Sequence, residues 1–256
     1  MNILRTTFKT LIACAAMLSV ASCSSDDETE TPPPAEPQEI TFGYGQGTYE
    51  GVNIPYREAE INVEDGVPAA LVIYLHGGTS KGSDNEAPIA EPGVDSIKTY
   101  LRDSGKDALF LVPQCAADKS WGATMNSALK ALIDEQVASG KIDTKRIYIF
   151  GGSMGGSGTW SLLSAYPGLF AAAMPVAGNP AGCIAANVAQ TPLFTVMGTD
   201  DRIMSLDPVS NFIAQLKYVG GECNFEVESG WTHEMTCIQS YTTDRLDWVF
   251  SHTKAQ

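Results

Sequence analysis

The chain has 256 residues, of which 16 are lysine or arginine and 30 are aspartate or glutamate, so that its formal net charge is −14. Such an acidic surface repels nucleic acid and acidic polymers, which we therefore exclude as partners, and it suits neutral substrates. Once the N-terminal segments described next are set aside, the remaining length is enough for one well-packed domain and short for two.

The first residues predict an export signal followed by a lipid anchor. Arg5 and Lys9 precede an apolar run, 11–20, which is too short to span a bilayer. Small residues then lead into Cys23, in a pattern that resembles a bacterial lipobox. There the signal peptide, residues 1–22 in this chain, is cut before a cysteine that then carries lipid. An ordinary secretory signal with a chance cysteine is the alternative.

Residues 23–39 predict a tether between this anchor and the folded part of the chain. Ser24-Ser25-Asp26-Asp27-Glu28 resembles the acidic export tag of some Gram-negative lipoproteins, and it would equally suit a soluble linker. Four prolines between positions 31 and 37 cannot propagate a helix or an inner strand, which favours extended chain. We therefore expect an outer-membrane lipoprotein, exposed at the cell surface, with its membrane contact through Cys23 and a folded domain over 40–256.

Alternating strands and helices predict an α/β architecture, a doubly wound and mostly parallel sheet with helices on both faces. The apolar runs are nearly continuous, as a sheet covered on both faces requires, whereas residues 47–63 look like antiparallel edge strands. The space between Val176 and Pro192 is too short for a large lid domain, so we expect an open site. We predict strands at 69–75, 108–112, 146–150, 171–176, 192–197 and 223–227, and helices at 126–139, 155–166, 209–219 and 238–250.

The turn after the strand at 146–150 carries the strongest chemical motif. Gly151-Gly152-Ser153-Met154-Gly155 is a G-x-S-x-G sequence between an apolar strand and a helix, where it holds a serine on a tight, strained bend. Glycines are needed on both flanks because a side chain there would collide with neighbouring backbone. We therefore predict that Ser153 is a nucleophile, and a glycine-rich turn without chemistry is the alternative.

A serine nucleophile needs a base, and the chain has three histidines. His252 lies beyond the last predicted helix. His76 ends a predicted strand and precedes two glycines, which is typical of a structural turn residue. His233 lies just after the last predicted strand, and we therefore predict that it is the base, with a packed loop histidine as the alternative.

The acid that orients the base should follow the strand predicted at 192–197. Two adjacent aspartates, Asp200 and Asp201, occur there, and either could hold the imidazole in one tautomer and stabilise the imidazolium. A developing oxyanion also needs at least two hydrogen-bond donors. We assign this role to the backbone N–H of Met154, directly after the nucleophile, and to the backbone N–H of Gly78, in the glycine turn after the strand predicted at 69–75.

Four motifs carry a resemblance to a known family, namely Leu75-His76-Gly77-Gly78, Val112-Pro113-Gln114, Gly151 to Gly156, and Tyr166 to Ala172. Together they resemble the α/β-hydrolase esterases, most of all polyhydroxybutyrate-depolymerase-like esterases and the feruloyl and acetyl-xylan esterases of carbohydrate esterase family 1. Predicted peptidases of similar sequence share these motifs. The resemblance covers residues 68–250, and its motifs are specific for fold and triad but not for substrate.

The resemblance implies an α/β-hydrolase fold and a serine carboxylic-ester hydrolase that acts through an acyl-enzyme on Ser153, without metal or cofactor. Relatives usually read Gly-x-x-Asp in the acid loop, which favours Asp201 over Asp200. One departure is Met197, where many relatives have a histidine. The expected reaction is removal of acetyl or feruloyl groups from plant polysaccharides, by a monomer. The alternatives are a prolyl-oligopeptidase-like serine peptidase and a non-catalytic glycan-binding surface lipoprotein.

Substrate-binding residues are predicted from their position near the motifs that end at the carboxyl edge of the expected sheet. We predict that Gln114, Trp121 and Trp231 contact an ester-bearing carbohydrate or a small aryl ester, since aromatic faces can stack on a feruloyl ring or a sugar. Packing within the domain, or tying down a loop in the case of Gln114, is the alternative. Trp160, on the predicted nucleophile helix, is expected in the core.

Four cysteines, Cys115, Cys183, Cys223 and Cys237, remain in the exported domain, which allows up to two disulfides in three connectivities. Cys223 and Cys237 flank the His233 loop, and a disulfide between them would brace it. No CxxC pair or histidine cluster accompanies them, which argues against a zinc site.

Overall fold

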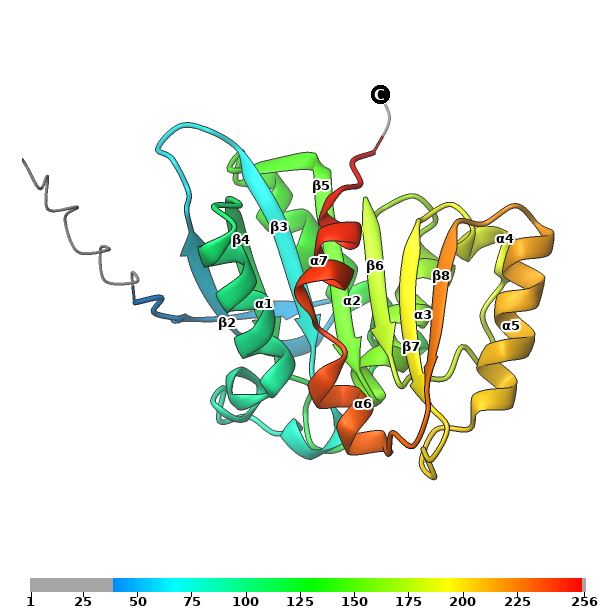
Figure 1. Ribbon diagram of the computed structural model, residues 1–256. Coiled ribbons are helices and arrows are strands. Elements are labelled where there is room, and N and C mark those ends of the chain that lie inside the picture. Colours follow the sequence, from blue (N-terminus) through cyan, green and yellow to red (C-terminus); the bar gives the residue numbers. More distant parts are fainter. Residues whose placement is uncertain (1–38, 255–256) are drawn as a thin grey trace, which may run out of the picture. The chain divides into compact units, whose positions relative to one another are not determined.

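The computed structural model describes residues 39–254, so the predicted signal peptide, the lipidated Cys23 and nearly all of the tether lie outside the described residues. One eight-stranded sheet has the order β1-β2-β4-β3-β5-β6-β7-β8 (Figure 1). Its strands are β1 (Gly43–Tyr49), β2 (Val52–Ile61), β3 (Ala69–Leu75), β4 (Ala108–Pro113), β5 (Ile142–Gly152), β6 (Ala172–Val176), β7 (Leu193–Gly198) and β8 (Cys223–Glu228).

The sheet is mixed at one edge and parallel elsewhere. Strand β2 pairs antiparallel with both β1 and β4, whereas every other neighbouring pair from β4 through β3 to β8 is parallel. The predicted mostly parallel, doubly wound sheet is therefore confirmed, as are the antiparallel edge strands. Because the strands from β3 to β8 are parallel, their carboxyl ends gather at one edge of the sheet, at the bottom of Figure 1.

Helices cover both faces of the sheet. On one face lie α1 (Pro92–Asp103) and α7 (Thr243–Phe250), and on the other lie α2 (Ala123–Ala138), α3 (Met154–Ala165) and α5 (Leu206–Tyr218) (Figure 1). The shorter elements are η1 (Gly78–Ser80), η2 (Ala87–Ala90), α4 (Ala185–Val188) and α6 (His233–Gln239). No helix within residues 39–254 has both the length and the apolar character needed to cross a bilayer.

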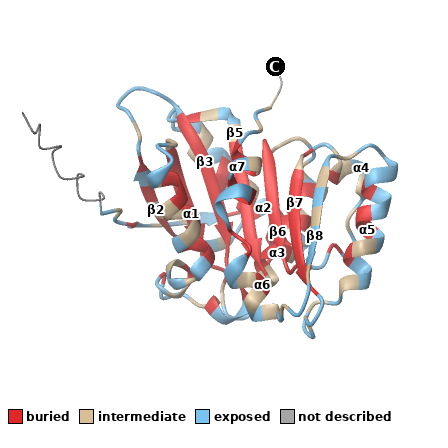
Figure 2. Ribbon diagram, viewed as in Figure 1, coloured by how far each residue is buried: buried red, intermediate tan, exposed pale blue. Residues whose placement is uncertain are grey.

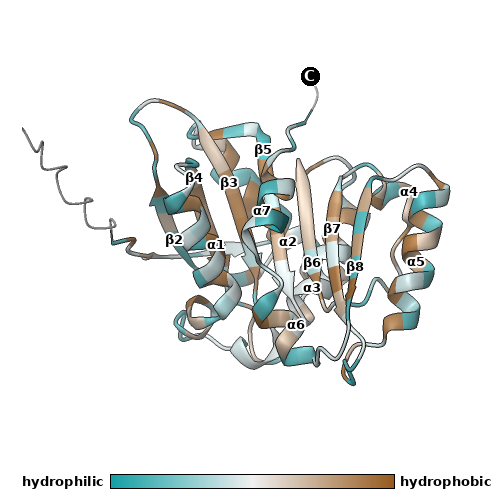
Figure 3. Cartoon of the chain, in the orientation of Figure 1, coloured by the Kyte–Doolittle hydropathy of each residue, from teal (hydrophilic) through white to brown (hydrophobic). Residues whose placement is uncertain are grey.

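Strand β3 shows why these runs form inner strands. Its side chains alternate between two separate cores: Leu71, Ile73 and Leu75 pack with α2, α3 and α5, while Val72 and Tyr74 pack with α1 and α7. Both faces of β3 are thus buried. The inner strands β3, β5, β6 and β7 appear largely buried in Figure 2 and largely apolar in Figure 3, whereas the edge strand β8 and the outward sides of the helices are exposed. Trp160 of α3 is fully buried, as predicted.

Two helical predictions differ from the structure. The helix predicted at 238–250 is two helices, α6 and α7, because the chain turns at Tyr241, whose ring is buried edge-on against Tyr74 and Phe150. Helix α1 was not predicted, although Pro92 at its start and buried Val94, Ile97 and Leu101 at helical spacing are the signals that mark such a helix.

The proposed disulfide between Cys223 and Cys237 is wrong in the structure. All four cysteines within residues 39–254 are free. Cys223 begins β8 and packs in the core under α2, α3 and α5, whereas Cys237 on α6 packs against the opposite core, beside His233. Two thiols on opposite faces of a sheet cannot be bridged without moving the backbone.

We expect both thiols to be alkylated when the unreduced protein is denatured in the presence of iodoacetamide. Peptide mass spectrometry measures this directly, because each of the two cysteine peptides would carry the label. A peptide pair joined through Cys223 and Cys237 would contradict the structure.

Candidate active site

Ser153 lies on a strained turn between β5 and α3, at the carboxyl edge of the sheet. Its φ is +57° and its ψ is −118°, a conformation that costs a non-glycine residue energy. Close packing explains the flanking glycines. A Cβ on Gly155 would lie 1.7 Å from the Leu75 carbonyl oxygen, and one on Gly151 would lie 2.5 Å from the carbonyl group of Gly155. The turn therefore presents the serine Oγ at the surface only because both flanks lack side chains.

Ser153, His233 and Asp201 form a connected series of hydrogen bonds. Ser153 Oγ lies 2.7 Å from His233 Nε2, and His233 Nδ1 lies 2.7 Å from Asp201 Oδ2. His233 is the first residue of α6, which begins there because the Thr232 hydroxyl caps it by accepting from the Met235 N–H. The three residues predicted as nucleophile, base and acid are thus brought together from three separate loops.

The structure distinguishes between the two adjacent aspartates. The side chain of Asp201 is fully buried, and its Oδ1 accepts hydrogen bonds from the backbone N–H groups of Ile203 and Met204, both at 2.8 Å. This leaves Oδ2 for His233. Asp200 is exposed, and its carboxylate accepts from the Thr199 hydroxyl instead. Of the two aspartates, only Asp201 is placed to orient the imidazole.

Both N–H groups predicted to bind an oxyanion lack acceptors among residues 39–254. Met154 is the first residue of α3, so its N–H has no partner within the helix. The neighbouring Gly77 N–H donates to Glu91, whereas no atom within residues 39–254 accepts from the Gly78 N–H. The Gly78 N–H is therefore available to a ligand in the cavity that this residue lines.

His76 is a structural residue, as predicted. It is fully buried, its Nε2 accepts from the Cys115 N–H at 2.9 Å, and its Nδ1 lies 2.6 Å from the Gly77 carbonyl oxygen. Burial lowers the pKa of His76 to about 4. The ring therefore stays neutral, with the proton on Nδ1, and holds the glycine turn in place.

A cavity of about 460 Å³ opens beside Ser153 and His233. Its wall is largely apolar: Pro92, Ile203 and Ile238 line it, and Ile203 and Ile238 are 69% and 41% exposed. Because these apolar side chains are exposed beside the nucleophile, the cavity suits an apolar group of a ligand. The other lining residues are Tyr74, Gly77, Gly78, Thr79, Glu91, Gly152, Glu234 and Cys237.

Gln114 was predicted to contact substrate, and the structure contradicts this. The side chain is fully buried. Its Oε1 accepts from the Asn85 N–H at 2.7 Å, and its Nε2 donates to the Ser80 carbonyl oxygen at 3.0 Å and to Asp84 Oδ1 at 2.7 Å. Every polar atom is used to tie down the loop over residues 80–85, so none is left for a ligand.

Trp121 and Trp231, also predicted to contact substrate, do not line the cavity beside Ser153. Trp121 is 5% exposed and donates from Nε1 to the His76 carbonyl oxygen at 3.0 Å, which supports the glycine turn from behind. Trp231 lies against Arg245 and borders a different depression. Sequence position places both tryptophans at the correct edge of the sheet, but the direction of each side chain depends on tertiary packing.

Several cavity residues were not identified from the sequence. Ile203 had a weak signal, since it is an apolar residue directly after the polar run Thr199 to Arg202 of the acid loop. Ile238 and Cys237 lie one turn after His233 on α6, and only the position of that helix brings them to the cavity. Glu91 had no signal at all, because nothing in its neighbourhood marks it as buried.

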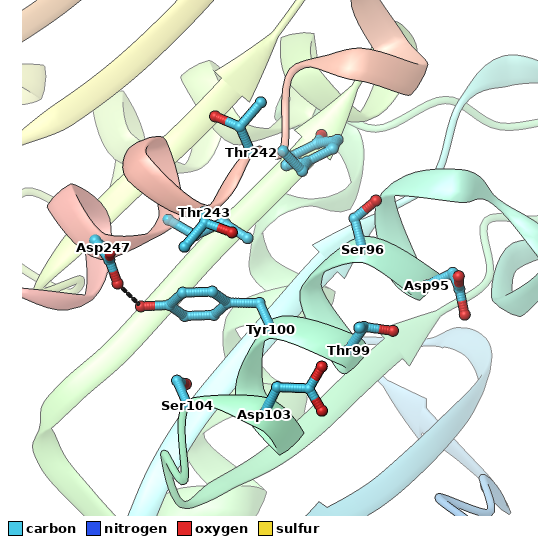
Figure 4. Close-up of a pocket in the computed structure, with 11 residues that line it drawn as sticks. Asp95, Ser96, Thr99, Tyr100, Asp103, Ser104, Thr242, Thr243 and Asp247 are labelled. Carbon is cyan, nitrogen blue, oxygen red and sulfur yellow. Dashed lines mark hydrogen bonds between the residues drawn. The ribbon is translucent and has the colours of Figure 1, made fainter. Parts of the chain in front are cut away.

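A larger cavity of about 700 Å³ lies between α1 and α7, away from the triad (Figure 4). It is lined by carboxylates and hydroxyl groups, and the Tyr100 hydroxyl donates to Asp247 across it. No triad residue borders it. Within residues 39–254, no group of three or more His, Cys, Asp or Glu side chains is arranged to hold a metal ion, in this cavity or elsewhere.

Comparison with known proteins gives related sequences that match part of the chain. No family model matches. A poly(3-hydroxyalkanoate) depolymerase C of Paucimonas lemoignei is 30% identical over 146 residues, which cover 53% of this chain and 34% of the depolymerase. A bifunctional acetylxylan esterase/xylanase of Neocallimastix patriciarum is 36% identical over 84 residues, 32% of this chain and 12% of that protein. The chain thus spans about a third or less of the length of these relatives.

Solved structures match the chain more completely. A thermostable esterase superposes with a TM-score of 0.70 at 25% identity, over 83% of this chain and 63% of the esterase. The feruloyl esterase module from Clostridium thermocellum, in complex with sinapinate, superposes with a TM-score of 0.70 at 14% identity, over 86% of this chain and 91% of the module. Together with the sheet order and the triad geometry, these likenesses show that the chain has the α/β-hydrolase fold.

Proposed function

We propose that the protein is a serine carboxylic-ester hydrolase. The observation that carries this proposal is the series of hydrogen bonds from Ser153 through His233 to Asp201, beside an open cavity into which the Gly78 N–H is free to donate. This arrangement supplies the nucleophile, the base, the orienting acid and an oxyanion donor that acyl transfer requires.

The geometry assigns a role to each group. Asp201 accepts the Nδ1–H of His233, which leaves Nε2 unprotonated and facing the Ser153 hydroxyl. Nε2 takes the serine proton as Oγ attacks the ester carbonyl, and the Gly78 and Met154 N–H groups stabilise the resulting oxyanion. His233 then returns the proton to the departing alcohol. Water, activated by the same imidazole, hydrolyses the acyl-enzyme.

The size and the apolar wall of the cavity beside Ser153 favour a substrate with an aromatic acyl group. Pro92, Ile203 and Ile238 offer apolar surface around a volume of about 460 Å³, far more than an acetyl group fills. The likeness to a feruloyl esterase module agrees with an aryl acyl group, whereas the likeness to an acetylxylan esterase agrees with an acetyl group. We propose feruloyl-type esters of plant polysaccharides as the preferred substrates. The lipid anchor on Cys23 and the outer-membrane location stay predictions from the sequence.

Hydrolysis of methyl ferulate and of an aryl acetate tests the proposal. We expect turnover of both esters, and a larger kcat/KM on methyl ferulate than on methyl acetate, a third substrate with the same leaving group. A larger kcat/KM on methyl acetate would retain the esterase and replace the aryl preference with an acetyl preference. Hydrolysis of an N-acyl-amino-acid anilide in place of any ester would support a peptidase instead.

Ile203 offers a direct test of the acyl site. We expect Ile203→Ser to raise KM for methyl ferulate about fivefold, the equivalent of ~1 kcal/mol of lost apolar contact, and to leave kcat for the aryl acetate within about twofold. Ile184→Ser is the matched control, because Ile184 is 58% exposed and does not line this cavity. An equal change of KM in both variants, measured by steady-state kinetics, would remove Ile203 from the acyl site.

A further inference from the structure

Glu91, the residue directly before α1, lines the cavity beside Ser153. Its Oε1 accepts from the Gly77 N–H at 2.8 Å and from the Ser80 hydroxyl at 2.6 Å, and its Oε2 accepts from the Tyr74 hydroxyl at 3.0 Å. One carboxylate oxygen therefore binds both ends of the turn over residues 77–80, and the other is tied to β3.

The turn over residues 77–80 is also held from other sides. His76 Nδ1 holds the Gly77 carbonyl oxygen, and Gln114 Nε2 holds the Ser80 carbonyl oxygen. Between these fixed ends lies Gly78. Its N–H has no acceptor within residues 39–254, as the proposed role of oxyanion donor requires. A Cβ on Gly77 would lie 3.4 Å from Glu91 Oε1 and 3.8 Å from Ser153 Cβ, so Gly77 separates the carboxylate from the nucleophile.

We propose that Glu91 is a positioning residue, which sets the oxyanion turn relative to Ser153 through the hydrogen bonds of its Oε1. This inference rests on the proposed esterase function. Displacing a preorganised donor by about 1 Å costs on the order of 10²-fold in rate, so the Oε1 contacts would be worth a comparable factor in kcat.

The turn over residues 77–80 is held by the hydrogen bonds that Glu91 accepts, and its negative charge is not required for this. Burial raises the pKa of Glu91, while its three hydrogen-bond donors act in the opposite direction. No lysine or arginine within residues 39–254 pairs with this carboxylate. A negative charge near a developing oxyanion opposes it, so a neutral group of the same shape should serve equally well. Glutamine is such a group, because its Oε1 accepts both bonds and its Nε2 can donate to the Tyr74 hydroxyl.

The test compares Glu91→Ala, Glu91→Gln and Glu91→Asp in the full chain, with Asp95→Ala as a control for loss of a nearby carboxylate on α1. The readouts are kcat and KM for an aryl acetate and the rate at which a fluorophosphonate labels Ser153, with folding checked by thermal melting. We expect the alanine and aspartate variants to lose about 30- to 100-fold in kcat and in labelling rate, with KM within about threefold. The glutamine variant should stay within about threefold of the wild type.

Three outcomes would overturn the proposal. Retention of kcat in Glu91→Ala with a lowered melting temperature would leave Glu91 a purely structural residue. Equal losses in the alanine and glutamine variants, or an unchanged Glu91→Asp variant, would show that charge matters and position does not. If Glu91→Ala does not fold, the aspartate and glutamine variants still decide. A wild-type chain that neither hydrolyses the ester nor reacts with the fluorophosphonate would refute the esterase function itself. If the wild-type chain reacts with the fluorophosphonate but does not hydrolyse the ester, the labelling rates of the Glu91 variants are compared instead of kcat.

Discussion

Replacement of Ser153 by alanine is expected to reduce kcat for ester hydrolysis on the order of 10⁵- to 10⁶-fold, as loss of the nucleophile does in other serine hydrolases. The reason is that no other hydroxyl contacts His233 Nε2 within the described residues, so the base has no nucleophile to activate. The residual rate would come from the oxyanion donors and substrate binding alone.

The fold should survive this substitution. Ser153 loses one partly buried hydrogen bond, to His233, which contributes about 1 kcal/mol. Its backbone bond to the Val176 carbonyl oxygen, at 3.0 Å, is unaffected. Ser161→Ala, in the helix α3 that follows Ser153, is the control, and it should keep turnover within about threefold and have a melting temperature close to that of Ser153→Ala. Turnover by a folded Ser153→Ala protein at more than about a tenth of the wild-type rate would rule out Ser153 as the nucleophile.

Asp201→Asn is expected to lower kcat on the order of 10⁴-fold with little change in KM. Oδ1 of residue 201 is held by two backbone N–H groups, so the amide nitrogen of asparagine must take the place of Oδ2, opposite His233 Nδ1. An amide donates where the carboxylate accepted. The imidazole proton would therefore move to Nε2, and Nε2 could no longer take the serine proton.

Asp200→Asn is the matched control, because it makes the same chemical change at the adjacent residue. Asp200 is exposed and contacts only the Thr199 hydroxyl through its side chain, so its kcat should stay within about twofold. Steady-state kinetics of both variants on one aryl ester measures the difference. Equal losses would mean that the acid loop tolerates neither change and that Asp201 has no special role.

Much of the fold could be predicted from the sequence because the information is local. Continuous apolar runs such as 69–75 mark strands buried on both faces, and the alternation of β3 side chains between two cores is what that pattern requires. The G-x-S-x-G motif can likewise be recognised locally, because it lies between an apolar strand and a helix, although Gly155 itself is required by the Leu75 carbonyl oxygen on a neighbouring strand. Where a long-range contact interrupts a local pattern, as Tyr241 does between α6 and α7, the prediction fails.

The sequence by itself determined the doubly wound sheet, the Ser153 turn and the choice of His233, because strand periodicity, glycine spacing and the order of loops along the chain are sufficient for each. Only the tertiary structure decided which aspartate faces the imidazole, that Gln114 and Trp121 hold loops in place, and that Trp231 lies against Arg245. It also showed that Glu91 enters the cavity. The physical reason is that adjacent residues share every local pattern, whereas the direction of a side chain follows from the backbone and packing around it.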